Sequence, residues 1–177
     1  CPWEVLCYDR SEHSAWCIWK IWDVRREAML LWSFIINPAI TVDELEIKNV
    51  ENSLGITFEE LQRQAIFEAF QSGVLVITGG PGTGKTTTLN AIIKLFESRN
   101  LEIELAAPTG RAAKRMTELT GRQAKTIHRL LEVEWSKDDK KCFVRNERNP
   151  LSCEVLIVDE ASMIDVLLFN DLLKALK

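Results

Sequence analysis

The clearest chemical signal in this sequence is the octapeptide Gly79-Gly80-Pro81-Gly82-Thr83-Gly84-Lys85-Thr86. It fits the pattern Gly-x4-Gly-Lys-Ser/Thr without a mismatch, and in this pattern the backbone N–H groups surround phosphate oxygens. Lys85 would reach the β- and γ-phosphates of a nucleotide, and the Thr86 hydroxyl would ligate Mg²⁺. The alternative is a glycine-rich turn with no ligand. Because the pattern is complete, we expect these eight residues and Thr87 to bind a nucleoside triphosphate.

Two neighbouring carboxylates, Asp159 and Glu160, follow the apolar run at residues 155–158. An apolar run that ends in acidic residues predicts a buried strand with its carboxylates at the ligand-binding edge of the sheet. Asp159 would hold Mg²⁺ opposite Thr86, and Glu160 would orient and deprotonate the water that attacks the γ-phosphate. A strand that merely ends in acidic residues is the alternative. Together with Lys85, these two residues are our candidate catalytic group.

The elements that must position these residues follow from the pattern of apolar positions and turn residues. We expect strands at 74–78, 101–107 and 155–158, and helices at 58–72, 86–98, 111–119, 126–134 and 164–176. Thr57 and Glu60 would form a capping box at the start of the helix at 58–72, and Gly73 would end it. Residues 135–149 are polar and predict a hairpin or loop. Strands that alternate with helices predict an α/β fold, a parallel P-loop NTPase sheet with helices on both faces.

The first 36 residues differ in composition from the rest. They hold five of the six tryptophans and three of the five cysteines, and their apolar positions follow neither a strand nor a helix period. We therefore predict an irregular segment at 1–36, either a remnant of an upstream domain or sequence translated out of frame. Residues 37–54 would form a linker or short helix, and residues 55–177 the ATPase domain.

The composition is that of a soluble globular protein, with 46% hydrophobic and 27% charged residues and a net charge of −4. Basic residues nonetheless outnumber acidic ones between positions 106 and 148, where a polyanion could bind or the charges could simply be solvated. The five cysteines form no Cys-x-x-Cys pair, which argues against a zinc site or a disulfide framework. The same cysteine pattern favours a reducing cytosol, so we expect a cytoplasmic protein, and no apolar run is long enough to span a bilayer.

Four segments together resemble the first motor domain of RecD-like superfamily 1 DNA helicases, which are related to the alpha subunit of exodeoxyribonuclease V. They are GGPGTGKTTT, AAPTGRAAKRM, AKTIHRLLE and VLIVDEASMID, in this order. The resemblance runs from about residue 55 to the end. It implies an ATP- and Mg²⁺-dependent helicase that translocates 5′ to 3′ on single-stranded DNA. It also implies a second RecA-like domain, whose motifs do not occur in this sequence, so we expect these residues alone to hydrolyse ATP poorly.

The resemblance assigns further residues. Gln62 matches the glutamine that recognises adenine in this family, and an exposed helical glutamine is the alternative. Single-stranded DNA would contact two of the four segments, at Pro108, Thr109, Gly110, Arg111, Thr126 and His128. Thr109 and Gly110 begin a helix, where backbone N–H groups can bind phosphate, whereas Arg111 could instead form a structural salt bridge. Two alternatives remain open: a nucleotide-binding module without turnover, and another P-loop ATPase of DNA repair.

Overall fold

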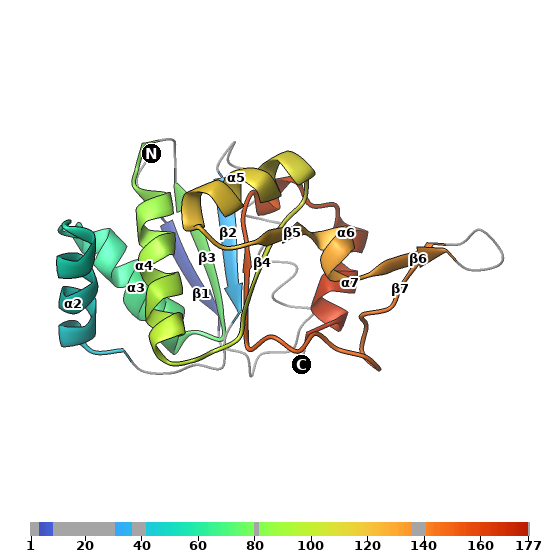
Figure 1. The fold of residues 1–177 in the computed structure, drawn as a ribbon, viewed down its shortest axis with the longest axis horizontal. Coiled ribbons are helices and arrows are strands. Elements are labelled where there is room, and N and C mark those ends of the chain that lie inside the picture. Colours follow the sequence, from blue (N-terminus) through green and yellow to red (C-terminus); the bar gives the residue numbers. More distant parts are fainter. Residues whose placement is uncertain (1–3, 9–30, 37–41, 80–81, 136–140, 177) are drawn as a thin grey trace.

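The computed structural model describes residues 4–8, 31–36, 42–79, 82–135 and 141–176, and a six-stranded sheet lies at its centre (Figure 1). The strands lie in the order β1-β3-β2-β8-β4-β5. Their bounds are β1 Glu4–Tyr8, β2 Leu31–Ile36, β3 Val74–Gly79, β4 Ile103–Ala107, β5 Ala124–Thr126 and β8 Val155–Val158.

Four of these strands run in one direction. β4 pairs in parallel with both β5 and β8, while β2 pairs antiparallel with both β3 and β8. β3 therefore has the direction of β8, β4 and β5, and only β1 and β2 run against them. The α/β sheet predicted from the sequence is confirmed for these four strands. The strand β5 was not predicted, because three residues between two helices carry too short a pattern to recognise.

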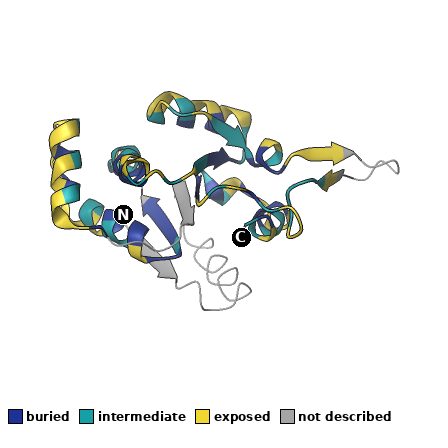
Figure 2. Ribbon diagram, turned by 60° about the horizontal axis from the view of Figure 1, so that its bottom comes forward, coloured by how far each residue is buried: buried dark blue, intermediate teal, exposed yellow. Residues whose placement is uncertain are grey.

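Helices cover both faces of the sheet, as predicted. The helices α2 Glu44–Leu54, α3 Glu60–Gln71, α4 Lys85–Ser98 and α5 Gly110–Thr120 pack on one face, and α6 Ile127–Leu130 and α7 Val166–Lys174 pack on the other. The side chains of β8 divide between the two cores, because successive residues of a strand point to opposite faces. Val155 and Ile157 belong to the first core, and Leu156 and Val158 to the second. Figure 2 shows buried residues in the strands and exposed residues on the outer helix surfaces.

The prediction of an irregular segment at 1–36 is wrong for two ranges. Residues 4–8 form β1 at the edge of the sheet, and residues 31–36 form β2 between β3 and β8. The β2 sequence LWSFII is rich in aromatic and β-branched residues, which favour strands, although it lacks the alternation that would have identified it. The predicted boundary at residue 37 thus falls directly after a strand of the main sheet.

Several helix ends also differ from the prediction. The helix α3 is capped by Glu59 and Gln62 rather than by Thr57 and Glu60, because the Gln62 side chain accepts a hydrogen bond from the Glu59 N–H at 2.9 Å. Ser72, and not Gly73, is its C-cap. The helix α6 is shorter than predicted, and α7 begins later, after the N-cap Asp165. Helix ends depend on which side chain satisfies the free N–H groups, and several nearby residues can do so.

The predicted excursion after α6 is a hairpin. β6 Val133–Trp135 pairs antiparallel with β7 Lys141–Phe143, and Figure 1 shows this pair extending away from the main sheet. The predicted turn at Asp138-Asp139 lies outside the described residues.

Candidate nucleotide and nucleic-acid site

Nearly all the predicted site residues follow the carboxyl ends of the four strands that share a direction. The phosphate loop follows β3, the two carboxylates follow β8, Pro108 to Arg111 follow β4, and Thr126 ends β5. The carboxyl ends of such strands meet at one edge of a sheet, where ligands of open α/β sheets bind. One hydrogen bond sets this alignment locally, since the Asp159 N–H donates to the Ala106 carbonyl at 3.0 Å.

The phosphate loop has the backbone that its glycines predict. Gly82 and Gly84 adopt φ of 80° and 78°, a left-handed conformation that residues with a Cβ rarely take. Gly84 is the N-cap of α4, whose first N–H groups lack partners within the helix and carry the positive end of its dipole. The loop therefore leads into an anion-binding helix terminus. Gly80 and Pro81 lie outside the described residues.

Lys85 and Asp159 form the contact that joins the two strongest predicted motifs. Lys85 Nζ donates a hydrogen bond to Asp159 Oδ1 at 2.9 Å, and the two side chains are 11% and 21% exposed. These residues are 74 positions apart in the sequence. The fold thus brings the cation predicted to bind phosphate against the carboxylate predicted to hold Mg²⁺. Thr86, in the first turn of α4, is half-buried.

Glu160 lies beside this pair in an unusual backbone conformation. Its φ of 53° and ψ of 34° are left-handed, although it is not a glycine. Its side chain is 18% exposed, and its Oε1 lies 4.0 Å from Nη1 of Arg115 on α5. A left-handed non-glycine residue costs about 1–2 kcal/mol, and such residues concentrate at functional sites. The contact with Arg115 was not predicted, because nothing local in the sequence links residues of different elements.

Gln62 lies next to the phosphate loop. A Cβ added to Gly84 would clash with Gln62 Nε2, so the amide group approaches the loop closely. Its carbonyl oxygen accepts from the Glu59 N–H, so one acceptor position of the amide is engaged in capping α3. Nε2 retains its two donor positions for the loop or a ligand. The placement fits a nucleotide contact, while adenine recognition by Gln62 stays a prediction.

A buried ion pair that was not predicted from the sequence anchors the start of α3. Glu51 is 8% exposed, and both of its carboxylate oxygens accept from Arg63 Nη2 at 2.7 Å. Glu51 Oε1 also accepts from the Phe58 N–H at 2.8 Å. The carboxylate thereby connects α2, Phe58 two residues before α3, and α3 itself. Because Arg63 follows Gln62 directly, the pair helps to fix Gln62 beside the loop.

The residues predicted to contact DNA have structural roles of their own. Thr109 is the N-cap of α5 and its Oγ1 accepts from the Ala112 N–H at 3.2 Å, while Thr126 caps α6 through the Arg129 N–H at 3.3 Å. His128 lies with its ring centre 6.0 Å from that of Phe143. Pro108 is half-buried, and Gly110 and Arg111 are exposed. These residues lie on one edge of the molecule, and their DNA contacts stay predictions.

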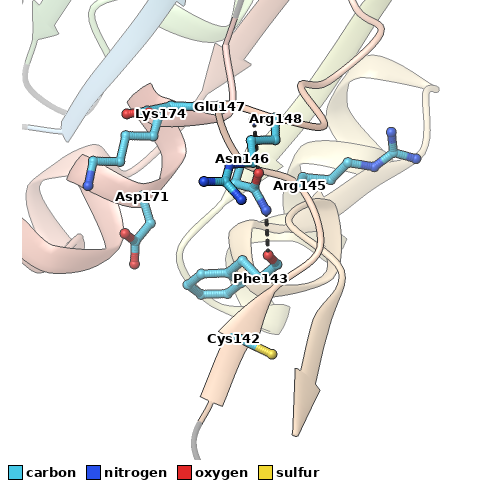
Figure 3. Close-up of a pocket in the computed structure, with 8 residues that line it drawn as sticks. All are labelled: Cys142, Phe143, Arg145, Asn146, Glu147, Arg148, Asp171 and Lys174. Carbon is cyan, nitrogen blue, oxygen red and sulfur yellow. Dashed lines mark hydrogen bonds between the residues drawn. The ribbon is translucent and has the colours of Figure 1, made fainter. Parts of the chain in front are cut away.

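A pocket of about 480 Å³ lies away from this edge, between α7 and the segment that follows β7 (Figure 3). Its lining includes Arg145, Arg148 and Lys174 together with Glu147 and Asp171, so charges of both signs face it. None of the predicted site residues lines it. The Arg145 guanidinium is itself paired with Glu132, at 2.9 Å.

The pKa of Cys153 clearly departs from its ordinary value. Burial, assisted by the neighbouring Glu104 carboxylate, raises the pKa of the Cys153 thiol to about 11. The thiol is therefore protonated at neutral pH and is not a nucleophile. Among the described residues no three His, Cys, Asp or Glu side chains gather as they would around a metal ion, and no helix is both long and apolar enough to cross a membrane.

Comparison with known proteins places the chain in a family. The family model described as AAA domain matches residues 62–177. The chain belongs to this family. The AAA domain match begins at Gln62 and includes the phosphate loop, the paired carboxylates and both predicted DNA segments.

Individual relatives agree with the resemblance to RecD-like helicases. The chain is 48% identical over 102 residues to the ATP-dependent RecD2 DNA helicase of Deinococcus radiodurans, covering 58% of this chain and 14% of the relative. It is 34% identical to the RecBCD enzyme subunit RecD of Buchnera aphidicola subsp. Schizaphis graminum, covering 90% of this chain and 29% of the relative. The chain is 40% identical to the ATP-dependent DNA helicase dda of Enterobacteria phage T4, and the match covers 58% of this chain and 24% of the relative. The chain thus spans less than a third of each relative.

Proposed function

We propose that this AAA domain binds ATP with Mg²⁺ and couples its hydrolysis to single-stranded DNA, as the first motor domain of a RecD-like helicase. The observation that carries the proposal is the 2.9 Å contact between Lys85 Nζ and Asp159 Oδ1. It joins the phosphate-binding lysine to the first of the paired carboxylates at the strand edge where the predicted DNA segments also lie. The names of the relatives support the DNA-coupled part of the proposal.

Each site residue has a role that its position supports. Lys85 and the N–H groups at the start of α4 bind the β- and γ-phosphates. The Thr86 hydroxyl and the Asp159 carboxylate are hard oxygen ligands that fit Mg²⁺, and the ion would neutralise charge on the phosphates. Glu160 accepts a proton from the attacking water. Thr87 follows in the same helix turn, and Gln62 lies beside the loop for the base.

Nucleotide binding tests the site. Lys85→Ala should weaken ATP-Mg binding by at least about tenfold, because it removes the cation that contacts the phosphates. Isothermal titration calorimetry with a non-hydrolysable ATP analogue measures this directly. Lys94→Ala is the matched control, since Lys94 is an exposed lysine on the same helix and its loss should leave the affinity unchanged. Equal affinity of the Lys85→Ala variant and the unaltered chain would refute the site.

Hydrolysis separates an ATPase from a nucleotide-binding module without turnover. Glu160→Gln keeps the size of the side chain and removes the base, so it should bind ATP-Mg normally and lose turnover by about 10²-fold or more. Single-turnover hydrolysis, with the protein in excess, resolves slow rates with and without single-stranded DNA. If Glu160→Gln hydrolyses ATP as the unaltered chain does, another group activates the water.

Direction and unwinding are finer parts of the proposal. The 5′-to-3′ polarity rests on the resemblance to RecD-like helicases alone, and duplexes with a 5′ or a 3′ single-stranded tail test it in a helicase assay. We expect the 177 residues by themselves to bind ATP-Mg without unwinding a duplex, because their motifs supply the contacts of one motor domain.

A further inference from the structure

Both carboxylates at the end of β8 are paired with a cation from another element. Asp159 is paired with Lys85 of the phosphate loop, and Glu160 with Arg115 of α5. The first pair lies within the predicted nucleotide site. The second is different, because α5 is the helix whose N-terminus carries the predicted DNA residues Thr109 and Gly110. The Arg115–Glu160 pair is therefore a direct link between the predicted DNA surface and the predicted catalytic base.

Arg115 is placed to bind a second partner. Its side chain is 65% exposed, whereas that of Glu160 is 18% exposed, so most of the arginine side chain faces solvent while the glutamate side chain is largely covered. Arg111 is exposed and lies four residues earlier on α5, which places the two arginines on the same side of the helix. Among the described residues no ion pair includes Arg111. Two neighbouring guanidinium groups on one helix face are well suited to a phosphodiester backbone.

The contact between Arg115 and Glu160 is weak enough for Arg115 to leave Glu160 for another anion. At 4.0 Å it is an ion pair without a hydrogen bond, and ion pairs with a solvent-exposed partner stabilise a protein only weakly. A DNA phosphate offers Arg115 two oxygens at hydrogen-bonding distance, which makes it a stronger partner. The left-handed backbone of Glu160 fixes the start of its side chain, so loss of Arg115 would release only the carboxylate end.

We propose that Arg115 is shared between Glu160 and a phosphate of single-stranded DNA. Without DNA, Arg115 holds the Glu160 carboxylate toward α5. When DNA binds, the guanidinium turns to the phosphate and the carboxylate becomes available to the water at the nucleotide. Arg115 is thus a positioning residue through which DNA activates ATP hydrolysis. The inference rests on the proposed function, because it assumes that DNA binds at α5 and that Glu160 is the base.

Glu160 and the DNA phosphate would compete for Arg115, so each would weaken the binding of the other. The competition can therefore be measured from the affinity for DNA alone. Removing the charge of Glu160 should free Arg115 and strengthen DNA binding. We expect Glu160→Gln to lower the Kd for a fluorescent single-stranded oligonucleotide by about 2–5-fold, the range given by the strength of such a pair. Arg115→Ala should raise the Kd, and Glu160→Gln should then have no further effect. Fluorescence anisotropy at fixed salt gives the Kd of the unaltered chain, of the two single variants and of the double variant, which together form a double-mutant cycle.

Glu118→Gln is the matched control for charge. Glu118 lies on α5 and pairs at 3.9 Å with Lys114, so its removal also deletes one negative charge near the DNA surface. Its effect on the Kd should be the same in the presence and the absence of Arg115, unlike that of Glu160→Gln. Arg115→Lys, which keeps the charge, should restore part of the coupling and so exclude a merely structural defect.

Hydrolysis gives a second readout. In single-turnover assays without DNA, Arg115→Ala should hydrolyse ATP about 2–5-fold faster than the unaltered chain, and DNA should stimulate it less. If Glu160→Gln shifts the Kd equally with and without Arg115, Arg115 is not shared and the inference is overturned. If the unaltered chain binds no single-stranded DNA, the DNA-coupled part of the proposed function is refuted, whatever the affinity of the chain for ATP.

Discussion

At the scale of single residues, Glu160 combines a proposed catalytic role with an unfavourable backbone. Its left-handed conformation suits glycine, and a Cβ there costs about 1–2 kcal/mol. We expect Glu160→Gly to be more stable than Glu160→Ala by about 1 kcal/mol, because only glycine adopts this backbone without strain. Urea denaturation of the two variants measures the difference, and both should lose hydrolysis.

The same pair of substitutions at Lys94 is the control. Lys94 lies inside α4, where glycine is less favourable than alanine by about 1 kcal/mol, so the order of stability should be reversed there. If alanine were also the more stable residue at position 160, the left-handed backbone of Glu160 would not be a source of strain. A strained residue retained beside Lys85 and Asp159 indicates that its side chain, and not its contribution to stability, accounts for its presence.

The residues of the proposed nucleotide site could be named from the sequence because each belongs to a pattern with a known chemical purpose. Lys85 and Asp159 were found in this way, and the structure brings their side chains to 2.9 Å. Arg115 was noticed as a cation in one of the predicted DNA segments, but its contact with Glu160 was not predicted. Its partner Glu160 lies in a different element, and the pairing depends on the register of β4 against β8. Contacts of this kind become visible only when the strands are placed side by side.

At the scale of elements, the Glu51–Arg63 pair holds the start of α3 against α2. Both side chains are largely buried, at 10% and 22% exposed, and Glu51 also accepts from the Phe58 N–H. Arg63→Met should reduce the free energy of unfolding by about 3 kcal/mol, because it leaves a buried carboxylate without its cation. Chemical denaturation provides the measurement.

A second substitution shows whether Arg63→Met loses stability because the ion pair is lost or because the packing of the arginine side chain is lost. In the Arg63→Met background, Glu51→Gln removes the unpaired charge and keeps an acceptor for Phe58, so part of the stability should return. No recovery in the double variant would mean that the arginine stabilises α3 through its packing. The helices themselves were predicted from their apolar faces, but their ends were not. Gln62 rather than Glu60 completes the cap of α3, and sequence alone does not choose between two such residues.

At the scale of the whole molecule, the order of strands sets how the two halves of the nucleotide site meet. The phosphate loop follows β3 and the carboxylates follow β8, yet these strands do not pair with each other. β2 lies between them and is hydrogen-bonded to both. The sequence predicted the direction of β3 and β8 correctly, since strand–helix alternation implies parallel strands. It could not predict their separation, because pairing partners are set by contacts across the sheet.

Two deletions test whether β2 holds this site together. Removing residues 1–8 takes away β1, an edge strand that pairs with β3 alone among the described strands, so the chain should still unfold cooperatively and bind ATP-Mg. Removing residues 1–36 also takes away β2, and the backbone groups of β3 and β8 that face it lose their hydrogen-bond partners. We expect this longer deletion to lose the cooperative transition in urea and to bind ATP-Mg at least about tenfold more weakly, because Lys85 and Asp159 depend on strands that β2 joins. A protein without residues 1–36 that unfolds at the same urea concentration as the full chain would contradict this role for β2. It would instead support the domain boundary at residue 37 that the composition predicts.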